Sequence, residues 1–552
     1  MKDVSKTEYF LIFFLLAATS IAAIVTLSDY GQGWDEDRLY SYADQSLNAY
    51  RALYDPNVSV DFGDDDLKFY GPAYLVGASL LVNGVQHLLP NVSEIDLWHI
   101  GNFICFQIGV FCFYWLLRRF TGVFPSITTT ALFATQPLFW GHSFINPKDI
   151  PFTVFYIASV YAGLKMLDDF EAKNFDIKQL ATSRYLYIAT LLLGLTISIR
   201  ILGFTAGMIV LFYLAFIRID KVLRLSYLYF SLPLIVTFIT WPYLWQAPIT
   251  NFLTSVNTML NFHWPWTVLF KGVYYRPGQL PRSYVPQLFS MQLSETALIL
   301  FAVGIIAMLF PANFKRHKKL LTLFFVWFVV PLIYILTKGM RLYDNTRQLL
   351  FMLPGGFLTI SMSLELISEH IKSWQARMLL FLLILSPGII GIINYHPYEY
   401  TYYNYFTIAN KSIFRNYETD YWGTSLKQIS SYINNHVPEN SYVVVRGPYK
   451  IVQNYARDDI VVVDYEEMAD TIFPTCSFYI VLLTRWDFDL SVYPDVEPVY
   501  LVEHNGSVLS VIKHISPQSS NLPCGTNREQ SQFLPSIDQQ KITALADHEI
   551  NN

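Results

Sequence analysis

Cysteines and clustered basic residues are scarce in this sequence, and each shortage excludes a class of function. The four cysteines among 552 residues follow no zinc or iron–sulfur spacing, which argues against such a metal site. The 38 Lys and Arg residues are outnumbered by 43 Asp and Glu residues. Because no basic tract is dense enough to follow a phosphate backbone, nucleic-acid binding is not expected.

The four cysteines divide into two pairs by position. Cys105 and Cys112 lie inside one apolar segment, whereas Cys476 and Cys524 lie toward the C-terminus. The second pair could form a disulfide in an oxidising compartment, and free thiols fit the sequence equally well.

Long apolar runs dominate what is present. Hydrophobic residues make up 53% of the chain and aromatic residues 17%, and they come in blocks of about twenty. About eleven runs are long enough to cross a hydrocarbon core of about 30 Å. They are 9–27, 98–117, 124–141, 150–167, 184–199, 202–217, 226–245, 294–312, 320–337, 348–366 and 378–395. We therefore predict a polytopic α-helical membrane protein, with residues 1–397 as its transmembrane domain.

A further apolar stretch, 73–90, decides the orientation. It contains Asn83, Gln86 and His87, and counting it as a span would move every later loop to the other side. Treated instead as an interfacial or re-entrant helix on the outer face, it leaves the N-terminus in the cytoplasm and everything after Tyr395 outside. Basic groups then mark the inner ends of the spans: Lys2, Lys6, Arg118, Arg119, 165–184, 218–224, 315–319, Lys372 and Arg377.

The C-terminal part is predicted to be a small extracytoplasmic α/β domain, 398–515, followed by a polar, disordered tail, 516–552. Its pattern indicates two helices and several short strands, with an Asn-Gly hairpin at 505–506. The expected helices are 425–437 and 449–456, and the expected strands are 442–445, 460–463 and 478–483. The chain shows no internal repeat.

Charges on the outer side are distributed unusually. The first outer loop, 28–72, holds ten acidic residues against three basic ones. Elsewhere on that face basic residues gather against the normal charge bias, and an anion at the membrane surface would explain them. They are Lys148, Arg200, Lys271, Arg276, Arg282, Lys338, Arg341 and Arg347. Arg200 lies at a tight turn between two apolar runs, where an ionisable group is a functional candidate.

Ordinary explanations exist for each of these features taken singly. Asp35 and Glu36 could be solvated loop carboxylates, and any one outer Arg or Lys could reach to lipid headgroups. The aromatic cluster at 263–266 fits an interfacial belt better than a platform for sugars. The gathering of so many charges on one face favours a functional site.

Several short motifs occur in an order that resembles the C-type glycosyltransferase superfamily, in particular family 39, the group of protein O-mannosyltransferases and lipid A aminoarabinose transferases. The motifs are 34–40 (Trp-Asp-Glu-Asp-Arg-Leu-Tyr), 68–72 (Lys-Phe-Tyr-Gly-Pro), 146–151 (Asn-Pro-Lys-Asp-Ile-Pro), 343–350 and 415–423. The sequence departs from the family pattern in two ways. The usual double proline after the lysine is absent, and the C-terminal domain lacks sugar-binding modules.

The resemblance implies an enzyme whose donor is a sugar linked through phosphate to a polyprenol. We expect Asp35 to act as the base in a single displacement, and Glu36 and Asp149 to orient the acceptor or to hold a divalent cation such as Mg, Mn or Ca. The expected ligands of the donor phosphate are Lys68, Arg200, Arg341 and Arg347. The supporting residues are Arg38, Tyr70 and Asp344.

Two other functions remain open at this stage. A transporter or flippase of a lipid-linked or anionic substrate would also need many spans, although such proteins usually place charges at mid-membrane in paired halves. A membrane scaffold would explain the outer domain but not the acidic first loop. The identity of the sugar, and whether the acceptor is a lipid, a glycan or a protein, does not follow from the sequence.

Overall fold

The computed structural model describes residues 5–63, 65–262, 264–409, 412–470 and 477–516. The chain divides into two compact units. The first is helical and comprises Met1–Asp29, Glu36–Trp264 and Pro281–Thr407. The second comprises Tyr30–Asp35, Pro265–Leu280 and Ile408–Asn552. The boundary therefore falls about ten residues after the position expected from the sequence, and two loop segments join the second unit.

In the described part of the chain, seven helical stretches are long and apolar enough to cross a membrane. They contain α1 (Lys6–Thr26), α4 (Glu94–Arg118), α7 (Asp149–Ala172), α10 (Phe204–Ile239), α14 with α15 (Pro311–Phe324, Val330–Lys338), α16 (Leu353–His370) and α17 (Trp374–Tyr395). Shorter apolar helices are α5 (Val123–Ala134), α9 (Arg184–Ile199) and α13 (Glu295–Met308). Each apolar run expected to span overlaps one of these helices, so the protein is an integral membrane protein.

Two of the expected spans lie in one long helix. The 36 residues of α10 are interrupted at Arg218, whose φ of −150° and ψ of 84° are not helical. The run 124–141 is likewise divided, because α5 ends before Gln136 and α6 (Pro137–Ile145) begins at a proline. Fewer long helices than apolar runs are seen because α10 contains two runs, and because three runs fall in the shorter helices α5, α9 and α13.

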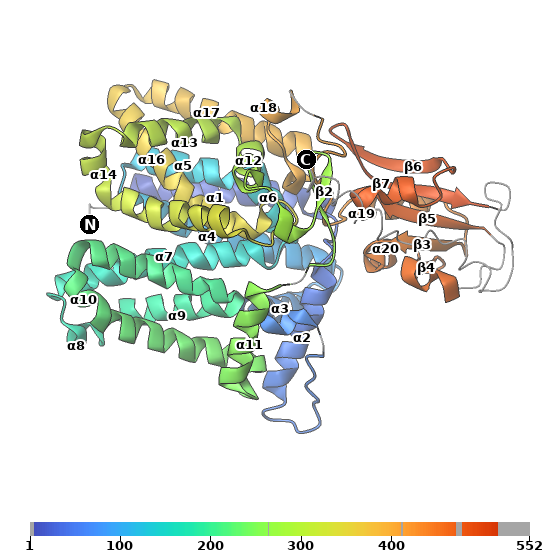
Figure 1. Ribbon diagram of the computed structural model, residues 1–552, viewed down its shortest axis with the longest axis horizontal. Coiled ribbons are helices and arrows are strands. Elements are labelled where there is room, and N and C mark those ends of the chain that lie inside the picture. The colour runs from blue at the N-terminus through green and yellow to red at the C-terminus, as the bar shows by residue number, and fades with distance from the viewer. Residues whose placement is uncertain (1–4, 64, 263, 410–411, 471–476, 517–552) are drawn as a thin grey trace, which may run out of the picture. The chain divides into compact units, whose positions relative to one another are not determined.

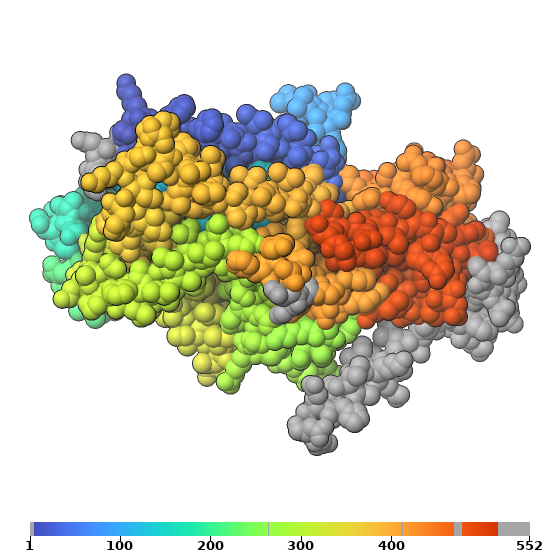
Figure 2. Space-filling view, turned by 90° about the horizontal axis from the view of Figure 1, so that it is seen from above, coloured from blue at the N-terminus to red at the C-terminus, as the bar shows by residue number. Residues whose placement is uncertain are grey.

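The surfaces of the outer helices are apolar. On α1, Phe10, Phe13 and Phe14 are more than half exposed, and Figure 2 shows α1 in dark blue and α17 in gold on the outside of the helical unit. A helix that is apolar on all sides and exposed suits lipid rather than water. By contrast, α7 and α16 are mostly buried inside the unit.

Short helices gather at one end of the helical unit. Helices α2 (Glu36–Arg51), α3 (Ala73–Leu88) and α11 (Pro248–Leu260) lie there, whereas α8 (Ile177–Leu180) lies at the opposite end (Figure 1). The prediction of a helix at 73–90 is confirmed, and α3 is not among the helices that could span a membrane. Its place in the membrane interface stays a prediction. Further short helices of this unit are α12 (Tyr284–Gln292) and α18 (Tyr405–Ile408).

A histidine joins the ends of the first and last long helices. His396 follows α17, and its Nε2 lies 2.9 Å from Asp29 Oδ2 while its Nδ1 lies 3.0 Å from Glu399 Oε1. Burial alone would lower the pKa of His396, but the hydrogen bonds and charges of Glu399 and Asp29 outweigh it and raise the pKa. The charged imidazole therefore stabilises the folded protein.

This contact predicts a pH-dependent stability. Because the pKa of His396 is raised on folding, its stabilisation is complete below the unfolded value of about 6.5 and is lost as the pH rises through the folded value. We expect the melting temperature of wild-type protein in detergent to exceed that of His396→Gln at low pH, with the difference shrinking above that range. His370→Gln, an exposed histidine on α16, is the control. A pH-independent difference would contradict the assignment.

The second unit contains a five-stranded sheet with the order β4-β3-β5-β7-β6. Strand β3 is parallel to β4 and β5, and β7 is antiparallel to β5 and β6. The strands are β3 (Tyr442–Arg446), β4 (Val461–Asp464), β5 (Phe478–Leu483), β6 (Pro498–His504) and β7 (Ser507–Ile515), and the helices are α19 (Leu426–His436), α20 (Tyr449–Tyr455) and α21 (Phe488–Ser491). The two helices, three strands and hairpin expected in this region are confirmed.

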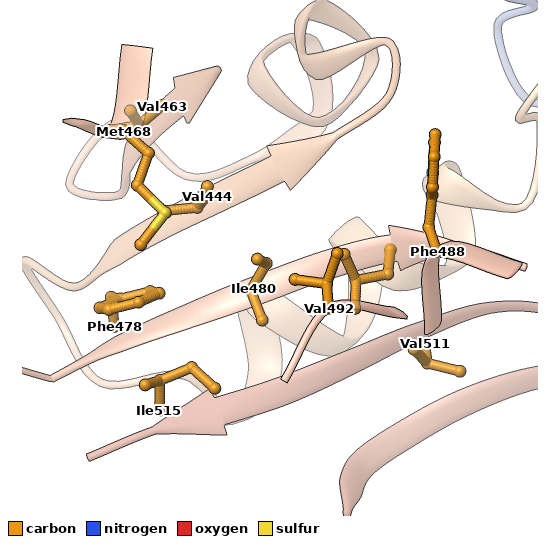
Figure 3. Close-up of a cluster of buried hydrophobic side chains, with 10 residues drawn as sticks. Val444, Val463, Met468, Phe478, Ile480, Phe488, Val492, Val511 and Ile515 are labelled. Carbon is orange, nitrogen blue, oxygen red and sulfur yellow. The ribbon is translucent and has the colours of Figure 1, made fainter. Parts of the chain in front are cut away.

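A small apolar core holds this sheet together. Val444, Ile480 and Val511 from adjacent strands pack with Phe488 and Val492 in one buried cluster (Figure 3). The expected polar tail after Ser516 lies outside the described residues, as do Cys476 and Cys524. The fold class predicted from the sequence, a many-helix membrane protein with a small α/β domain, is confirmed.

Candidate active site

Asp149 opens α7 and is shared by two arginines from distant parts of the chain. Its Oδ1 accepts a hydrogen bond from Arg200 Nη2, and its Oδ2 accepts one from Arg347 Nη1 at 3.0 Å. Arg347 also donates to Asp344 Oδ2 from Nε at 3.0 Å and from Nη2 at 2.8 Å. The side chains of Asp149, Asp344 and Arg347 are at most 3% exposed. Four of the predicted site residues thus form one buried ion-pair cluster.

The turn before α7 fixes Asp149 through Asn146. Asn146 Oδ1 accepts hydrogen bonds from the backbone N–H groups of Lys148 and Asp149, at 3.2 Å and 2.8 Å. Its Nδ2 donates to Asp149 Oδ2 at 3.0 Å. An asparagine suits this place because its short amide can bond the backbone two or three residues ahead. The turn therefore holds the Asp149 carboxylate before any ligand binds.

Arg200 reaches the cluster because α9 stops at Ile199. Arg200 itself is extended, with φ −148° and ψ 134°, and a short 3-10 turn follows. Residues 70–72 pack directly against this turn, since a Cβ on Gly71 would lie 1.8 Å from the carbonyl oxygen of Ser198. Only glycine permits this approach, which brings the ring of Tyr70 to 5.8 Å from the Arg200 guanidinium.

The Tyr70 ring also contacts a second cation. Lys148 Nζ lies 4.3 Å from the centre of the Tyr70 ring, a distance typical of a cation–π contact. Among the described residues Lys148 Nζ makes no hydrogen bond or ion pair. The sequence had marked Lys148 only as one of many outer cations, and nothing in the motif shows that its side chain turns toward Tyr70.

The cluster keeps unused cationic donors. Arg200 Nε is buried without a hydrogen-bond partner in the described structure, and buried donors without partners are rare in proteins. Lys148 Nζ, with no hydrogen bond or ion pair among the described residues, lies over Tyr70 beside Arg200. An oxyanion is the ligand class that such cationic donors bind best.

Glu36 has a separate, fully buried site. His99 Nε2 lies 3.0 Å from Glu36 Oε2, with both side chains 0% exposed, and the Tyr40 hydroxyl donates to the same oxygen at 2.7 Å. The Tyr40 ring stacks on Trp98, with centroids 4.1 Å apart. The start of α4 therefore fixes the start of α2. His99 was missed because it opens an apolar run, although a histidine at that depth is itself a signal.

Asp35, the expected base, belongs to the other unit. It is partly exposed in a turn, one residue after Trp34, whose backbone N–H donates to Trp422 O at 2.9 Å. Lys427 Nζ donates to Tyr30 O at 2.9 Å, so residues 30–35 are held by the C-terminal domain. The catalytic role of Asp35 stays a prediction.

Two expected phosphate ligands do not join the cluster in the described structure. Lys68 Nζ donates to Gly63 O at 2.5 Å, and Arg341 Nη1 donates to Asn261 O at 3.0 Å and Phe262 O at 3.2 Å. Lys68 lies in a short 3-10 helix and Arg341 in an exposed loop, and both bond nearby carbonyls, which sequence position alone could not reveal. Their role as phosphate ligands stays a prediction.

Arg38 pairs with the acidic loop, as expected. Its Nη2 lies 2.6 Å from Asp65 Oδ1 and 2.8 Å from Asp66 Oδ1. Burial and the hydrogen bond with Asp65 raise the pKa of Asp66. For Asp65, burial acts in the opposite direction to the hydrogen bond from Arg38, and the pKa is lowered. These contacts hold the loop together and leave Arg38 half exposed.

The carboxylates do not form a metal site in this arrangement. Glu36 is bonded by a histidine and a tyrosine, and both oxygens of Asp149 accept from arginine. Within the described residues, no group of three His, Cys, Asp or Glu side chains could hold a metal ion. Because cationic donors occupy the oxygens that a divalent cation needs, the geometry favours an anion at Asp149 rather than a cation.

Comparison with known proteins gives a match in structure alone. The sequence matches no protein-family profile and no curated protein. The apo oligosaccharyltransferase of Archaeoglobus fulgidus matches with a TM-score of 0.53 and 10% identity, over 86% of this chain and 69% of that chain. ArnT from Cupriavidus metallidurans bound to undecaprenyl phosphate matches with a TM-score of 0.51 and 10% identity, over 92% and 98%. The chain has the fold of the C-type membrane glycosyltransferases.

The C-type fold agrees with the resemblance seen in the sequence motifs. ArnT in its apo state matches over the same shares of the two chains, with a TM-score of 0.50 and 11% identity. At this identity the likeness concerns the C-type fold, and the residues of this chain must supply the evidence for its chemistry.

Proposed function

We propose that the protein is a glycosyltransferase that moves a sugar from a polyprenyl-phosphate donor to an acceptor hydroxyl on the extracytoplasmic face. The N-terminus is then cytoplasmic and the C-terminal domain extracytoplasmic. The observation that carries the proposal is the cluster of Arg200, Arg347 and Lys148 around Asp149, with its unused cationic donors. A lipid phosphate supplies the acceptor oxygens and negative charge that these groups need.

The chemistry follows from a leaving group that is already stable. Asp35 removes the proton from the acceptor hydroxyl as its oxygen forms a bond to the anomeric carbon, and the bond from that carbon to the phosphate oxygen breaks. The electron pair leaves on polyprenyl phosphate, where charge builds up, and Lys148 and Arg200 stabilise it. Inversion at the anomeric carbon results from this single displacement. Glu36, buried against His99, positions the chain next to Asp35.

A flippase is the second function that the same lipid site would serve. It would bind the polyprenyl phosphate through the same cations and release it uncleaved. The partly exposed carboxylate of Asp35 favours the enzyme, because such a group has no task in lipid movement. ArnT, which has a similar fold, was solved bound to undecaprenyl phosphate. Breakage of the bond between sugar and phosphate separates the two functions.

The experiment uses purified full-length protein and a synthetic polyprenyl-phosphate sugar labelled in the sugar. We expect wild type to release or transfer the label, and Lys148→Gln to raise the donor KM by about tenfold or more, since hydrogen bonds to charged groups contribute about 1.5–3 kcal/mol. Lys338→Gln, an exposed lysine at the end of α15, is the matched control and should leave KM unchanged. Label that crosses a bilayer still joined to the lipid would establish the flippase instead.

A further inference from the structure

A stack of tryptophans in the second unit adjoins the proposed base. Trp486 lies at its centre, and the ring of Trp266 stacks on it with centroids 4.6 Å apart and planes 23° apart. The ring of Trp34 meets the edge of Trp486 at 6.1 Å. Three segments far apart in the sequence thus supply one aromatic surface, and Trp34 directly precedes Asp35.

The turn that presents Trp486 is held in an unusual conformation. Trp486 and Asp487 both have positive φ, 57° and 55°, which costs free energy for residues other than glycine and is concentrated at functional sites. Trp486 Nε1 donates to Thr267 O at 2.9 Å. Asp487 accepts from the Tyr274 hydroxyl at 3.0 Å and from Arg415. Hydrogen bonds at two neighbouring side chains therefore fix the central ring.

Trp266 is the most exposed ring of the three. Trp486 is contacted by Trp266 and by the Arg485 guanidinium, which lies 4.2 Å from the centre of the Trp486 ring. Trp266 is 37% exposed, so part of its ring is available to a ligand.

The hairpin that carries Trp266 is anchored as well. Strands β1 (Val268–Phe270) and β2 (Val273–Tyr275) follow Trp266 directly and pair antiparallel. At the turn, Gly272 N–H donates to Asn416 O at 3.0 Å, and Phe270 forms a β-bridge with Tyr417. The exposed tryptophan is thus preorganised, which removes the entropic cost of ordering it when a ligand binds.

We infer that the exposed part of the Trp266 ring, in the same aromatic cluster as Trp34, binds a carbohydrate acceptor, so that the acceptor hydroxyl belongs to a glycan rather than to a protein side chain. This inference rests on the proposed function. The polarised C–H face of a sugar ring fits the negative face of an indole. The indole of Trp266 is flat and held rigidly in the same unit as Asp35, and such a surface suits a rigid sugar ring. A tryptophan that only anchors the protein in lipid headgroups needs no such fixation.

Saturation-transfer NMR on the purified full-length protein in detergent tests this assignment. The probes are mannotriose, galactotriose and a β-1,6-linked glucosamine disaccharide, with a Ser/Thr-rich peptide beside them. We expect transfer to the ring C–H protons of at least one sugar, an affinity about tenfold lower in Trp266→Ala, and recovery in Trp266→Phe. Trp374→Ala removes an indole that is 68% exposed on α17 and should leave sugar binding unchanged. Trp34→Ala provides a second test if Trp266→Ala does not fold.

The outcomes distinguish a failure of the carbohydrate site from a failure of the glycosyltransferase proposal. Absence of transfer to every sugar, binding of the peptide alone, or equal affinity in wild type and Trp266→Ala overturns the carbohydrate site. Cleavage of the labelled donor by wild type without any added acceptor is measured in parallel. If that cleavage is absent while sugars bind, the glycosyltransferase proposal fails and the sugar-binding surface stands.

Discussion

Replacing Asp149 by Ala is expected to cost more stability than any other single change at the site. The carboxylate is 2% exposed and accepts hydrogen bonds from two arginines, so its removal leaves Arg200 and Arg347 buried with too little negative charge. Breaking a buried ion pair by removing one partner costs about 3–5 kcal/mol. Donor cleavage should be lost as well, because both guanidinium groups lose the oxygen that positions them.

Thermal unfolding in detergent, followed by fluorescence, measures this effect. Asp168→Ala is the matched control, since Asp168 also pairs with an arginine, Arg119, but its side chain is 43% exposed and such pairs contribute about 0–1 kcal/mol. Asp149→Asn keeps the shape of the side chain and removes its charge. Its melting temperature should fall between those of Asp149→Ala and Asp168→Ala. Equal melting temperatures for Asp149→Ala and Asp168→Ala would show that the cluster is not a buried network.

The membrane architecture could be predicted from the sequence because the bilayer imposes a simple requirement. Backbone groups in hydrocarbon must be bonded within a helix, so apolar runs of sufficient length become helices whatever their detailed packing. The same rule cannot show that Pro137 begins a new helix or that Arg218 interrupts α10. Those breaks depend on local turns and neighbours.

Part of the site could also be predicted, because charge is costly in an apolar chain. Arg200 and Arg347 were found as cations on the outer side, Asp149 was found through the motif at 146–151, and the three meet. Lys68, chosen from its motif, and Arg341, chosen as an outer cation, bond nearby carbonyls instead. A flexible side chain on a loop can reach several partners, and only the folded backbone decides among them.

The residues that the sequence did not indicate were missed for a different reason. His99 bonds Glu36 across two helices that are far apart in the sequence, and Lys148 lies over Tyr70 from another loop. No periodicity encodes such contacts. The hairpin at 268–275 joins the C-terminal unit through Phe270 and Tyr417. The sequence of a loop between two spans does not predict such a pairing.

Transfer of labelled sugar by wild type and Asp35→Asn, compared in proteoliposomes, tests the central claim most directly. We expect the variant to fold and to bind the polyprenyl-phosphate donor, since Asp35 is a partly exposed turn residue, but to lose transfer by about 100-fold or more, the usual contribution of a general base. Asp37→Asn, two residues away, should transfer at close to the wild-type rate. Transfer by Asp35→Asn at the wild-type rate would contradict the account.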